Sequence, residues 1–202
     1  FKAYPELLSS RRFWGYCLTA TFSAGAYFAY LGGAAYVGRE IFGLSPALLG
    51  FYLGAPAIGY IIGNGLSGRF SITFGLNKMI LTGTLITAFG MLLCISLFLF
   101  TPPIPLSFFG CVSFMGIGNG MVLPNATSGM MSVRPHLAGS ASGIGGTINT
   151  AGGAGIAMAT SAILVPGTGT LPLLLIMLAS TITSVATIAY VMKRAKDLSF
   201  TN

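Results

Sequence analysis

The stretch that decides the fold class is MGIGNGMVLPNATSGMMSVRPHLAGSASGIGGTINTAGGAGIAMA, residues 115–159. It consists of two long apolar segments rich in glycine, alanine and serine, joined by a short link that carries Arg134, Pro135 and His136. In water these segments would be poor helices, because each glycine in a helix interior costs about 1 kcal/mol relative to alanine. In a bilayer the same small residues let helix backbones approach closely. The stretch therefore predicts a close-packed pair of transmembrane helices.

The composition of the whole chain also indicates a membrane protein. Hydrophobic residues make up 54% of the 202 residues and charged residues 6%, whereas a soluble domain has about 25% charged residues. The net charge of +7 comes from scattered basic residues beside apolar segments. Because no basic run with interleaved aromatic residues occurs, we expect no nucleic-acid partner. We predict an all-α integral membrane protein whose surroundings are the lipid bilayer.

Six apolar segments are long enough to cross the ~30 Å hydrocarbon core, which takes about 20 helical residues. We place these spans at about 13–37, 47–68, 79–100, 106–131, 138–165 and 171–192. Residues 13–192 would then form one six-helix transmembrane bundle, preceded by a cytoplasmic segment at 1–12 and followed by a cytoplasmic tail at 193–202. Uncharged turns rich in proline and glycine separate the spans at 101–105 and 166–170.

The distribution of charge predicts the orientation of the chain in the membrane. With six spans, nine of the ten basic residues lie on the side of both termini: Lys2, Arg11, Arg12, Arg69, Lys78, Arg134, Lys193, Arg194 and Lys196. Arg39, next to Glu40, lies on the other side. Because cytoplasmic loops carry an excess of lysine and arginine, we expect both termini to be cytoplasmic, in the inner (plasma) membrane of a bacterium.

No group of residues in the chain is typical of an enzyme. The one histidine, His136, lies in a loop, and the three acids, Glu6, Glu40 and Asp197, lie outside the spans. There is no carboxylate pair for acid–base catalysis, no metal-ligand cluster and no nucleotide-binding loop after a strand. We therefore expect no enzyme activity, no cofactor and no metal site.

Uncharged polar residues within the spans are the candidates for ligand binding. Asn119 and Asn149 lie deep in their spans, where an amide must find a partner or face a water-filled cavity. Each of them either bonds a neighbouring helix or contacts a ligand. Tyr27 and Tyr30 lie three residues apart on one helical face. They either line an aromatic pocket for an apolar ligand or pack within the bundle.

Small residues spaced by four predict the faces along which the helices pack. The pairs are Gly59 with Gly63, Gly139 with Gly143, and Ala151 with Gly155. In the second span, Pro56 is expected to bend the helix.

Three stretches resemble the C-terminal half of drug:H+ antiporters of the major facilitator superfamily, of the bicyclomycin/chloramphenicol resistance (Bcr/CflA) type. The seventh and eighth helices of these antiporters are similar to YLGGAAYVGREIFGLSPALLGFYLGAPAIGYIIGNGL at 30–66, with its FGLSP turn. Their junction of helices ten and eleven is similar to GNGMVLPNATSGMMSVRPHLAGSASGIGGT at 118–147, with its PNAT and AGSAS runs. Their central loop resembles YPELLSSRRFWGYCL at 4–18.

The loop between the second and third spans departs from the superfamily's pattern. Where a Gly-x-x-x-Asp-Arg-x-Gly-Arg loop often stands, this chain keeps Arg69, Gly75 and Lys78 but has Gly68 in the place of the acid. A charge-relay gate is therefore not expected in this half. Arg69 and Lys78 are still expected to anchor the cytoplasmic face.

The resemblance implies one half of a secondary active transporter, with the substrate held between two halves near the midplane. It implies export of small amphipathic molecules, as in multidrug efflux and antibiotic resistance, by alternating access in exchange for protons. The cavity candidates are Tyr27, Tyr30, Met115, Asn119 and Asn149. Because no acid lies within the spans, the proton-carrying carboxylate would belong to the N-terminal six-helix half, the expected partner. The start at Phe1 rather than at a methionine fits a piece of a longer protein.

Two alternatives remain open. The chain could be a self-contained six-helix channel or facilitator that acts as an oligomer, although it lacks charged rings and paired half-helix pore motifs. It could also be a half-size transporter that dimerises. The small-molecule substrate is inferred by analogy alone.

Overall fold

The structure is a computed structural model that describes residues 3–199, with side chains described for residues 5–195. The described residues form helices and turns without a strand. The elements are α1 (Ala3–Leu8), α2 (Arg11–Tyr36), the π-helical segment η1 (Val37–Ile41), α3 (Pro46–Leu53), α4 (Ala55–Phe74), α5 (Leu76–Phe100), α6 (Pro105–Val133), the 3-10 segment η2 (Pro135–Leu137), α7 (Ala138–Ile163) and α8 (Leu171–Ser199).

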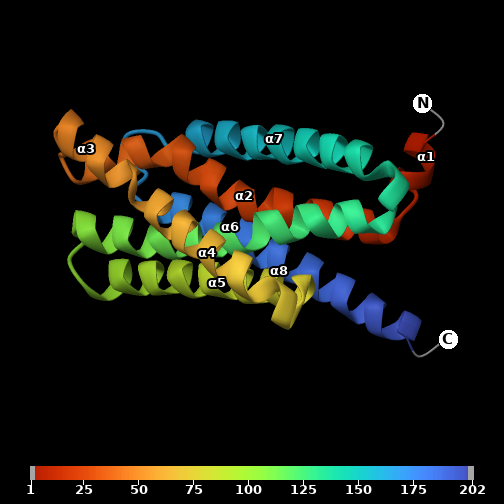
Figure 1. Ribbon diagram of the computed structural model, residues 1–202. Coiled ribbons are helices and arrows are strands. Elements are labelled where there is room, and N and C mark those ends of the chain that lie inside the picture. Colours follow the sequence, from red (N-terminus) through yellow and green to blue (C-terminus); the bar gives the residue numbers. More distant parts are fainter. Residues whose placement is uncertain (1–2, 200–202) are drawn as a thin grey trace.

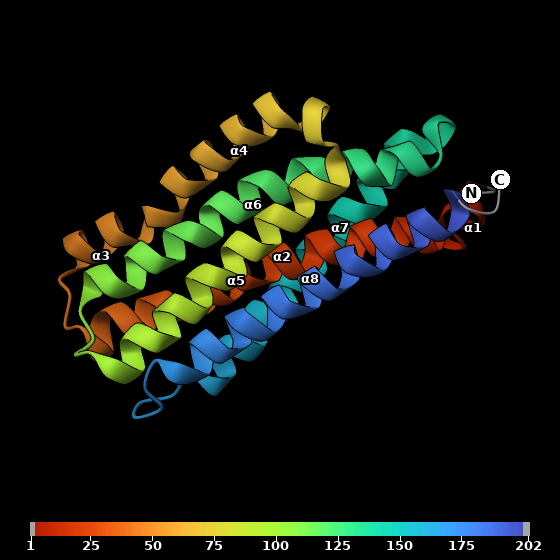
Figure 2. The same ribbon diagram turned by 90° about the horizontal axis from the view of Figure 1, so that it is seen from below.

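Two layers of three long helices make up the bundle (Figures 1 and 2). In one layer α6 packs against both α4 and α5, and in the other α2 packs against both α7 and α8. The layers meet where α2 contacts α6 and where α5 contacts α8. The two central helices are thus α2 and α6, whereas α4 and α7 each pack mainly on one of them.

The helices occupy the six ranges expected from the sequence, with one break and several shifted ends. The second range is divided, because α3 ends at Leu53 and α4 begins at Ala55, with Gly54 between them. Pro56 accounts for the break, since it has no N–H to donate to the carbonyl of Tyr52. The helix α4 then continues to Phe74, beyond the expected end at 68, because no proline or glycine interrupts residues 69–74.

Within residues 3–199, four helices are long and apolar enough to cross a membrane. They are Pro46–Phe74 (with α3 and α4 taken together), Leu76–Phe100, Pro105–Val133 and Leu171–Ala195. The other two long helices, α2 and α7, have 26 residues each. They are less apolar, because glycine, tyrosine and hydroxyl-bearing residues are spread along α2 and α7 is rich in glycine, serine and threonine.

Within residues 5–195, all basic residues but Arg39 gather at one end of the bundle, where α2 begins and α6 ends (Figure 1). We call this the basic end; its members are Arg11, Arg12, Arg69, Lys78, Arg134, Lys193 and Arg194. The segment η1, with Arg39 and Glu40, lies at the opposite end, where α2 gives way to α3.

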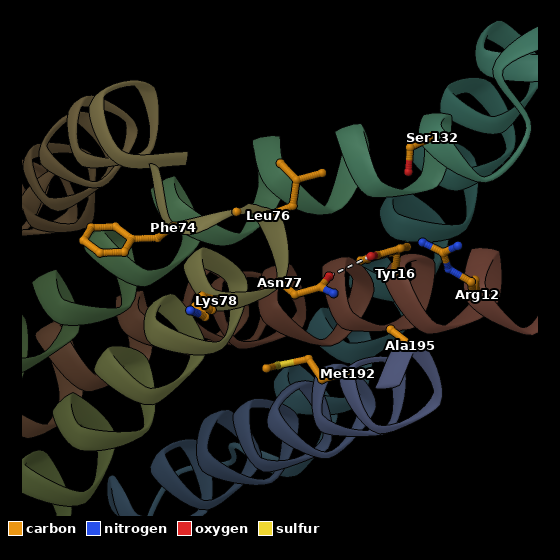
Figure 3. A pocket seen from close by; sticks show the side chains of 10 residues that line it. Arg12, Tyr16, Phe74, Leu76, Asn77, Lys78, Ser132, Met192 and Ala195 are labelled. Atoms are coloured by element: carbon orange, nitrogen blue, oxygen red, sulfur yellow. Dashed lines mark hydrogen bonds between the residues drawn. The ribbon is translucent and has the colours of Figure 1, made fainter. Parts of the chain in front are cut away.

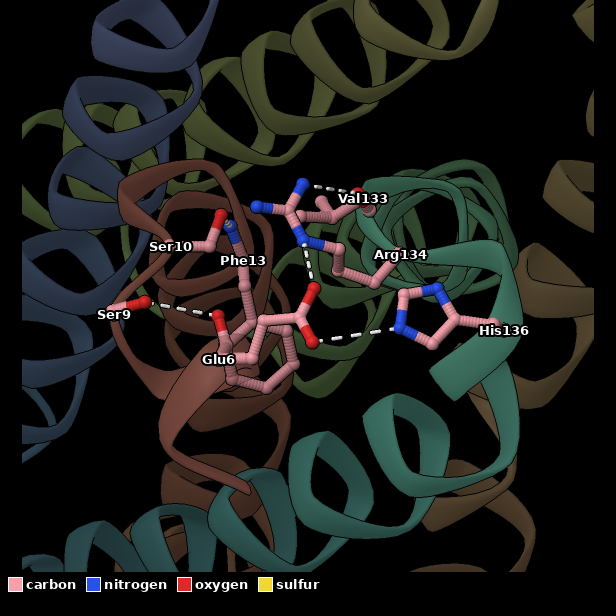
Figure 4. Close-up of polar contacts among 7 residues, drawn as sticks. All are labelled: Glu6, Ser9, Ser10, Phe13, Val133, Arg134 and His136. Carbon is pink, nitrogen blue, oxygen red and sulfur yellow. Dashed lines mark hydrogen bonds and ion pairs between the residues drawn. The ribbon is translucent and has the colours of Figure 1, made fainter. Parts of the chain in front are cut away.

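An ion pair at the basic end ties α1 to the link between α6 and α7 (Figure 4). One carboxylate oxygen of Glu6 accepts from Nε of Arg134 at 2.8 Å, and the other lies 3.5 Å from Nε2 of His136. Ser10, which lies between α1 and α2, caps α2, because its side-chain oxygen accepts a hydrogen bond from the N–H of Phe13. Because the paired side chains are about half exposed, the pair is worth only about 0–1 kcal/mol. It positions α1 more than it stabilises the bundle.

Glycine lets α4 and α6 pack backbone to backbone. A Cβ atom at Gly59 would overlap the carbonyl oxygen of Ser113, and one at Gly63 would overlap that of Ile117. Both obstacles are backbone atoms, which a side-chain rotation cannot move. The glycines that α6 contributes to the same interface are Gly116 and Gly120.

The other predicted packing residues lie on an exposed face of α7. A Cβ atom at Gly139, Gly143 or Gly155 would have no described atom within 4 Å, and Ala151 is exposed. Within the described part of the chain these residues therefore pack against no other helix. We call this surface the α7 small-residue face.

Candidate functional site

A cavity of about 470 Å³ lies among α2, α4, α6 and α7. It sits halfway along the bundle, since its lining residue Asn119 is the central residue of α6. None of the described residues that line it is charged. The lining residues are Ala24, Tyr27, Phe28, Pro56, Ala57, Tyr60, Ile61, Gly116, Asn119, Leu123, Asn149 and Thr150.

The amide of Asn119 is oriented by the opposing central helix. The hydroxyl of Ser23 donates to Oδ1 of Asn119 at 2.7 Å, and both residues are buried. This bond links α2 to α6 and holds the side chain in one orientation. Asn119 is thus left with its NH2 group as the donor that it can offer to a ligand.

The amide of Asn149 is the one whose oxygen lacks a partner. Its Oδ1 atom is buried and accepts no hydrogen bond from the described residues, although the residue lines the cavity. An unmade hydrogen bond at a buried polar atom costs about 1–3 kcal/mol. If the amide turns toward the cavity, a ligand N–H or O–H group that bonds this oxygen would recover that energy.

Aromatic side chains form the apolar part of the cavity wall. Tyr27 and Phe28 come from α2 and Tyr60 from α4, and both tyrosines are partly exposed, at 37% and 40%. Rings of this kind stack on flat or amphipathic molecules and add apolar burial. The cavity therefore combines aromatic surface with two amides and no net charge.

Two of the residues expected at the cavity lie elsewhere. Tyr30 is completely buried, packs against Phe108 and Phe109, and donates its hydroxyl to the carbonyl of Leu53 at 3.2 Å. Met115 is likewise completely buried, in the same apolar cluster. Three helical residues turn the chain by about 300°, so Tyr30 points about 60° away from Tyr27. That difference is enough to move Tyr30 from the cavity into the core.

Of the residues expected at the loop between the second and third spans, only Gly75 lies between helices, because Arg69 belongs to α4 and Lys78 to α5. Gly75 joins α4 to α5 with a φ of +82°, where a side chain would be strained. Lys78 lines a pocket at the basic end with Arg12, next to the hydrogen bond from the Tyr16 hydroxyl to Oδ1 of Asn77 at 2.7 Å (Figure 3). Arg69 lies over the ring of Phe70, 5.8 Å from its centroid.

Sequence reasoning missed most of the cavity lining, including Phe28, Tyr60 and Thr150, and also Ser23, which orients Asn119. Tyr60 carried a usable signal, because it stands between the packing glycines Gly59 and Gly63 in the middle of a span. The others lie among many similar residues, and only the contacts between helices single them out.

Comparisons with known proteins point to one family. The family model of the Major Facilitator Superfamily matches residues 13–201. A protein of Bacillus subtilis (strain 168), described as the uncharacterized MFS-type transporter YdgK, is 28% identical over 147 residues, which are 73% of this chain and 36% of that protein. The chain thus matches about a third of that relative's length. No solved structure matches the chain. Because the family model covers nearly the whole chain, this integral membrane protein belongs to the major facilitator superfamily of transporters.

Proposed function

We propose that the chain is the C-terminal half of a secondary active transporter that exports small amphipathic molecules by alternating access, in exchange for protons. The observation that carries the proposal is the uncharged, aromatic cavity halfway along the bundle. Thr150 of this cavity lies seven residues, or about two turns, after Gly143 of the α7 small-residue face. The cavity and that face would therefore both turn toward an N-terminal half.

We propose that all six long helices cross the membrane. At 1.5 Å per residue, the 26 residues of α2 and of α7 reach about 39 Å, more than the ~30 Å hydrocarbon core. Their lower hydropathy is compatible with this role, because both helices line the cavity and so need not be apolar all round. The basic end would face the cytoplasm.

Proton exchange would require a carboxylate from the partner half. The described acids of this chain, Glu6 and Glu40, lie at opposite ends of the bundle and away from the cavity. Intramembrane carboxylates are the usual proton carriers of transporters. In this proposal the chain binds substrate, and its partner couples the movement to protons.

The direct test is transport by the full-length protein in inverted membrane vesicles. We expect energised vesicles to accumulate a neutral aromatic dye, and we expect collapse of the pH gradient to release it. A self-contained channel or facilitator would equilibrate the dye at the same rate with and without the gradient. That result would refute the exchange of protons.

Substitution of Gly143 by leucine tests whether the α7 small-residue face meets another bundle. No described atom lies within 4 Å of a Cβ atom at Gly143, so the protein should fold normally. Overpacking at a helix contact costs about 1–3 kcal/mol, and we expect the transport rate to fall about tenfold. Leu175→Trp, on an exposed part of α8, serves as the control and should transport normally.

A cysteine at the same position separates the remaining alternatives. In the proposed arrangement, Gly143→Cys would form cross-links to cysteines placed in the N-terminal half of the same polypeptide. Cross-links formed only between two copies of this chain would favour the dimeric half-transporter or the oligomeric channel.

A further inference from the structure

Four arginines surround a pocket of about 460 Å³ at the basic end. Arg11 and Arg12 come from the first turn of α2, Arg134 from the residue after α6, and Arg194 from α8. Two hydroxyl-bearing residues, Ser9 and Ser10, complete the lining. This arginine pocket lies outside the substrate cavity and takes no part in the proposed transport.

The charge in the arginine pocket is not balanced by the described protein. Within residues 5–195, Glu6 is the one acid at this end, and it pairs with Arg134 (Figure 4). Like charges that converge on one space repel one another. The planar guanidinium group matches the oxygens of a phosphate, to which it can donate two parallel hydrogen bonds. The pocket is therefore suited to a phosphate-bearing anion.

A second cavity, of about 350 Å³, shares Arg11 with the arginine pocket and runs between α2 and α8. Its walls are mostly apolar or small; the lining residues are Arg11, Trp14, Gly15, Leu18, Thr183, Ala186, Thr187 and Tyr190. The hydroxyl of Thr187 donates a hydrogen bond to the carbonyl of Ser184 at 2.9 Å. We call this cavity the α2–α8 groove.

The aromatic residues of the α2–α8 groove mark a membrane interface. Trp14 donates its indole N–H to the carbonyl of Leu8 at 2.7 Å, so its ring is held beside the groove. Tyr190, 48% exposed, stands on the other wall. Tryptophan and tyrosine gather at the level of the lipid headgroups. An apolar groove that starts at this level and at an arginine pocket has the shape of a lipid site.

We propose that the arginine pocket and the α2–α8 groove together bind one anionic phospholipid. The phosphate group contacts the arginines, and one acyl chain lies in the groove. Basic pockets between transmembrane helices are known to hold anionic headgroups. The groove favours a lipid over free phosphate, because a free ion would leave the apolar walls uncovered.

The test uses the fluorescence of Trp14 in the full-length protein, with a Trp14→Phe variant to subtract any other tryptophan. The protein is reconstituted in phosphatidylcholine with brominated chains, which quench a nearby indole, and unbrominated phosphatidylglycerol is then added. Recovery of fluorescence measures the affinity for phosphatidylglycerol relative to phosphatidylcholine. We expect a clear preference for phosphatidylglycerol. Each of Arg11→Gln and Arg194→Gln should lower the preference roughly fivefold.

Two further variants make the test specific. Arg69→Gln removes a charge from the same end but outside the pocket, and it should leave the preference unchanged. Ala186→Phe fills the groove from an exposed position, and it should weaken lipid binding while every arginine is retained.

Three results would overturn the proposal. Equal affinities for the two lipids in the unmodified protein would exclude an anionic site. If Arg69→Gln lowered the preference for phosphatidylglycerol as much as Arg11→Gln does, the preference would come from the general surface charge of this end. Full binding by Ala186→Phe, together with displacement of phosphatidylglycerol by millimolar glycerol phosphate, would indicate a site for free phosphate. None of these results bears on transport itself.

Discussion

Replacing Gly63 by valine is expected to destabilise the folded protein strongly. The new Cβ would overlap the backbone carbonyl of Ile117, so α4 and α6 would have to separate. Overpacking usually costs about 1–3 kcal/mol, and here the obstacle is backbone that cannot rotate away. Because close contact of small residues is a main source of helix association in membranes, we expect a loss at the upper end of that range.

The matched control is Gly65→Val, two residues further along α4. No described atom lies within 4 Å of a Cβ atom at Gly65, so the same substitution changes helix propensity equally without a clash. The melting temperature and the yield of monodisperse full-length protein measure the difference. If both variants prove equally stable, the close approach of α4 and α6 is wrong.

Replacing Asn149 is expected to have the largest effect on transport. Asn149→Leu removes the unpartnered acceptor from the cavity but keeps the volume of the side chain. For a substrate that donates to this oxygen, a loss of about 1–3 kcal/mol corresponds to about 5- to 150-fold weaker binding. Uptake at subsaturating substrate should fall by that factor, while the amount of protein in the membrane stays the same.

Asn149→Asp gives a sharper form of the same test. It keeps the acceptor and adds a negative charge to a cavity whose described lining has none. We expect the preference to move from neutral compounds toward amphipathic cations, measured as the ratio of uptake rates for a neutral and a cationic dye.

The control for these variants is Asn64→Leu. The amide of Asn64 bonds the carbonyl of Tyr60 in its own helix and does not line the cavity, so transport should be unaffected. Asn119→Leu should lower both transport and stability, because it also leaves the hydroxyl of Ser23 unpaired. Unaltered transport by both Asn149→Leu and Asn119→Leu would remove these residues from the site.

The contacts between helices show what a spacing of small residues predicts and what it does not. The spacing of Gly59 and Gly63 indicated a packing ridge, and in the structure both glycines lie against α6. The same spacing at Gly139 and Gly143 meets no described neighbour. A ridge of small residues predicts that another helix can approach closely, but it does not predict which helix.

The candidate site shows the same limit at the level of single side chains. Tyr27 and Tyr30 were expected on one face, yet Tyr27 lines the cavity while Tyr30 fills the core beside Phe108. The amides of Asn119 and Asn149 were equivalent in the sequence. Ser23 distinguishes them, since it satisfies the oxygen of Asn119 and leaves that of Asn149 without a partner.

The sequence by itself determined the all-helical class, the approximate extents of the long helices and the gathering of basic residues at one end. These follow from local physics, because apolar length, proline and glycine breaks and charge at helix ends act within a few residues. Only the tertiary structure decided which helices touch and which side chains face the cavity. Those outcomes depend on rotations of about 60° and on neighbours more than 90 residues away, as between Ser23 and Asn119.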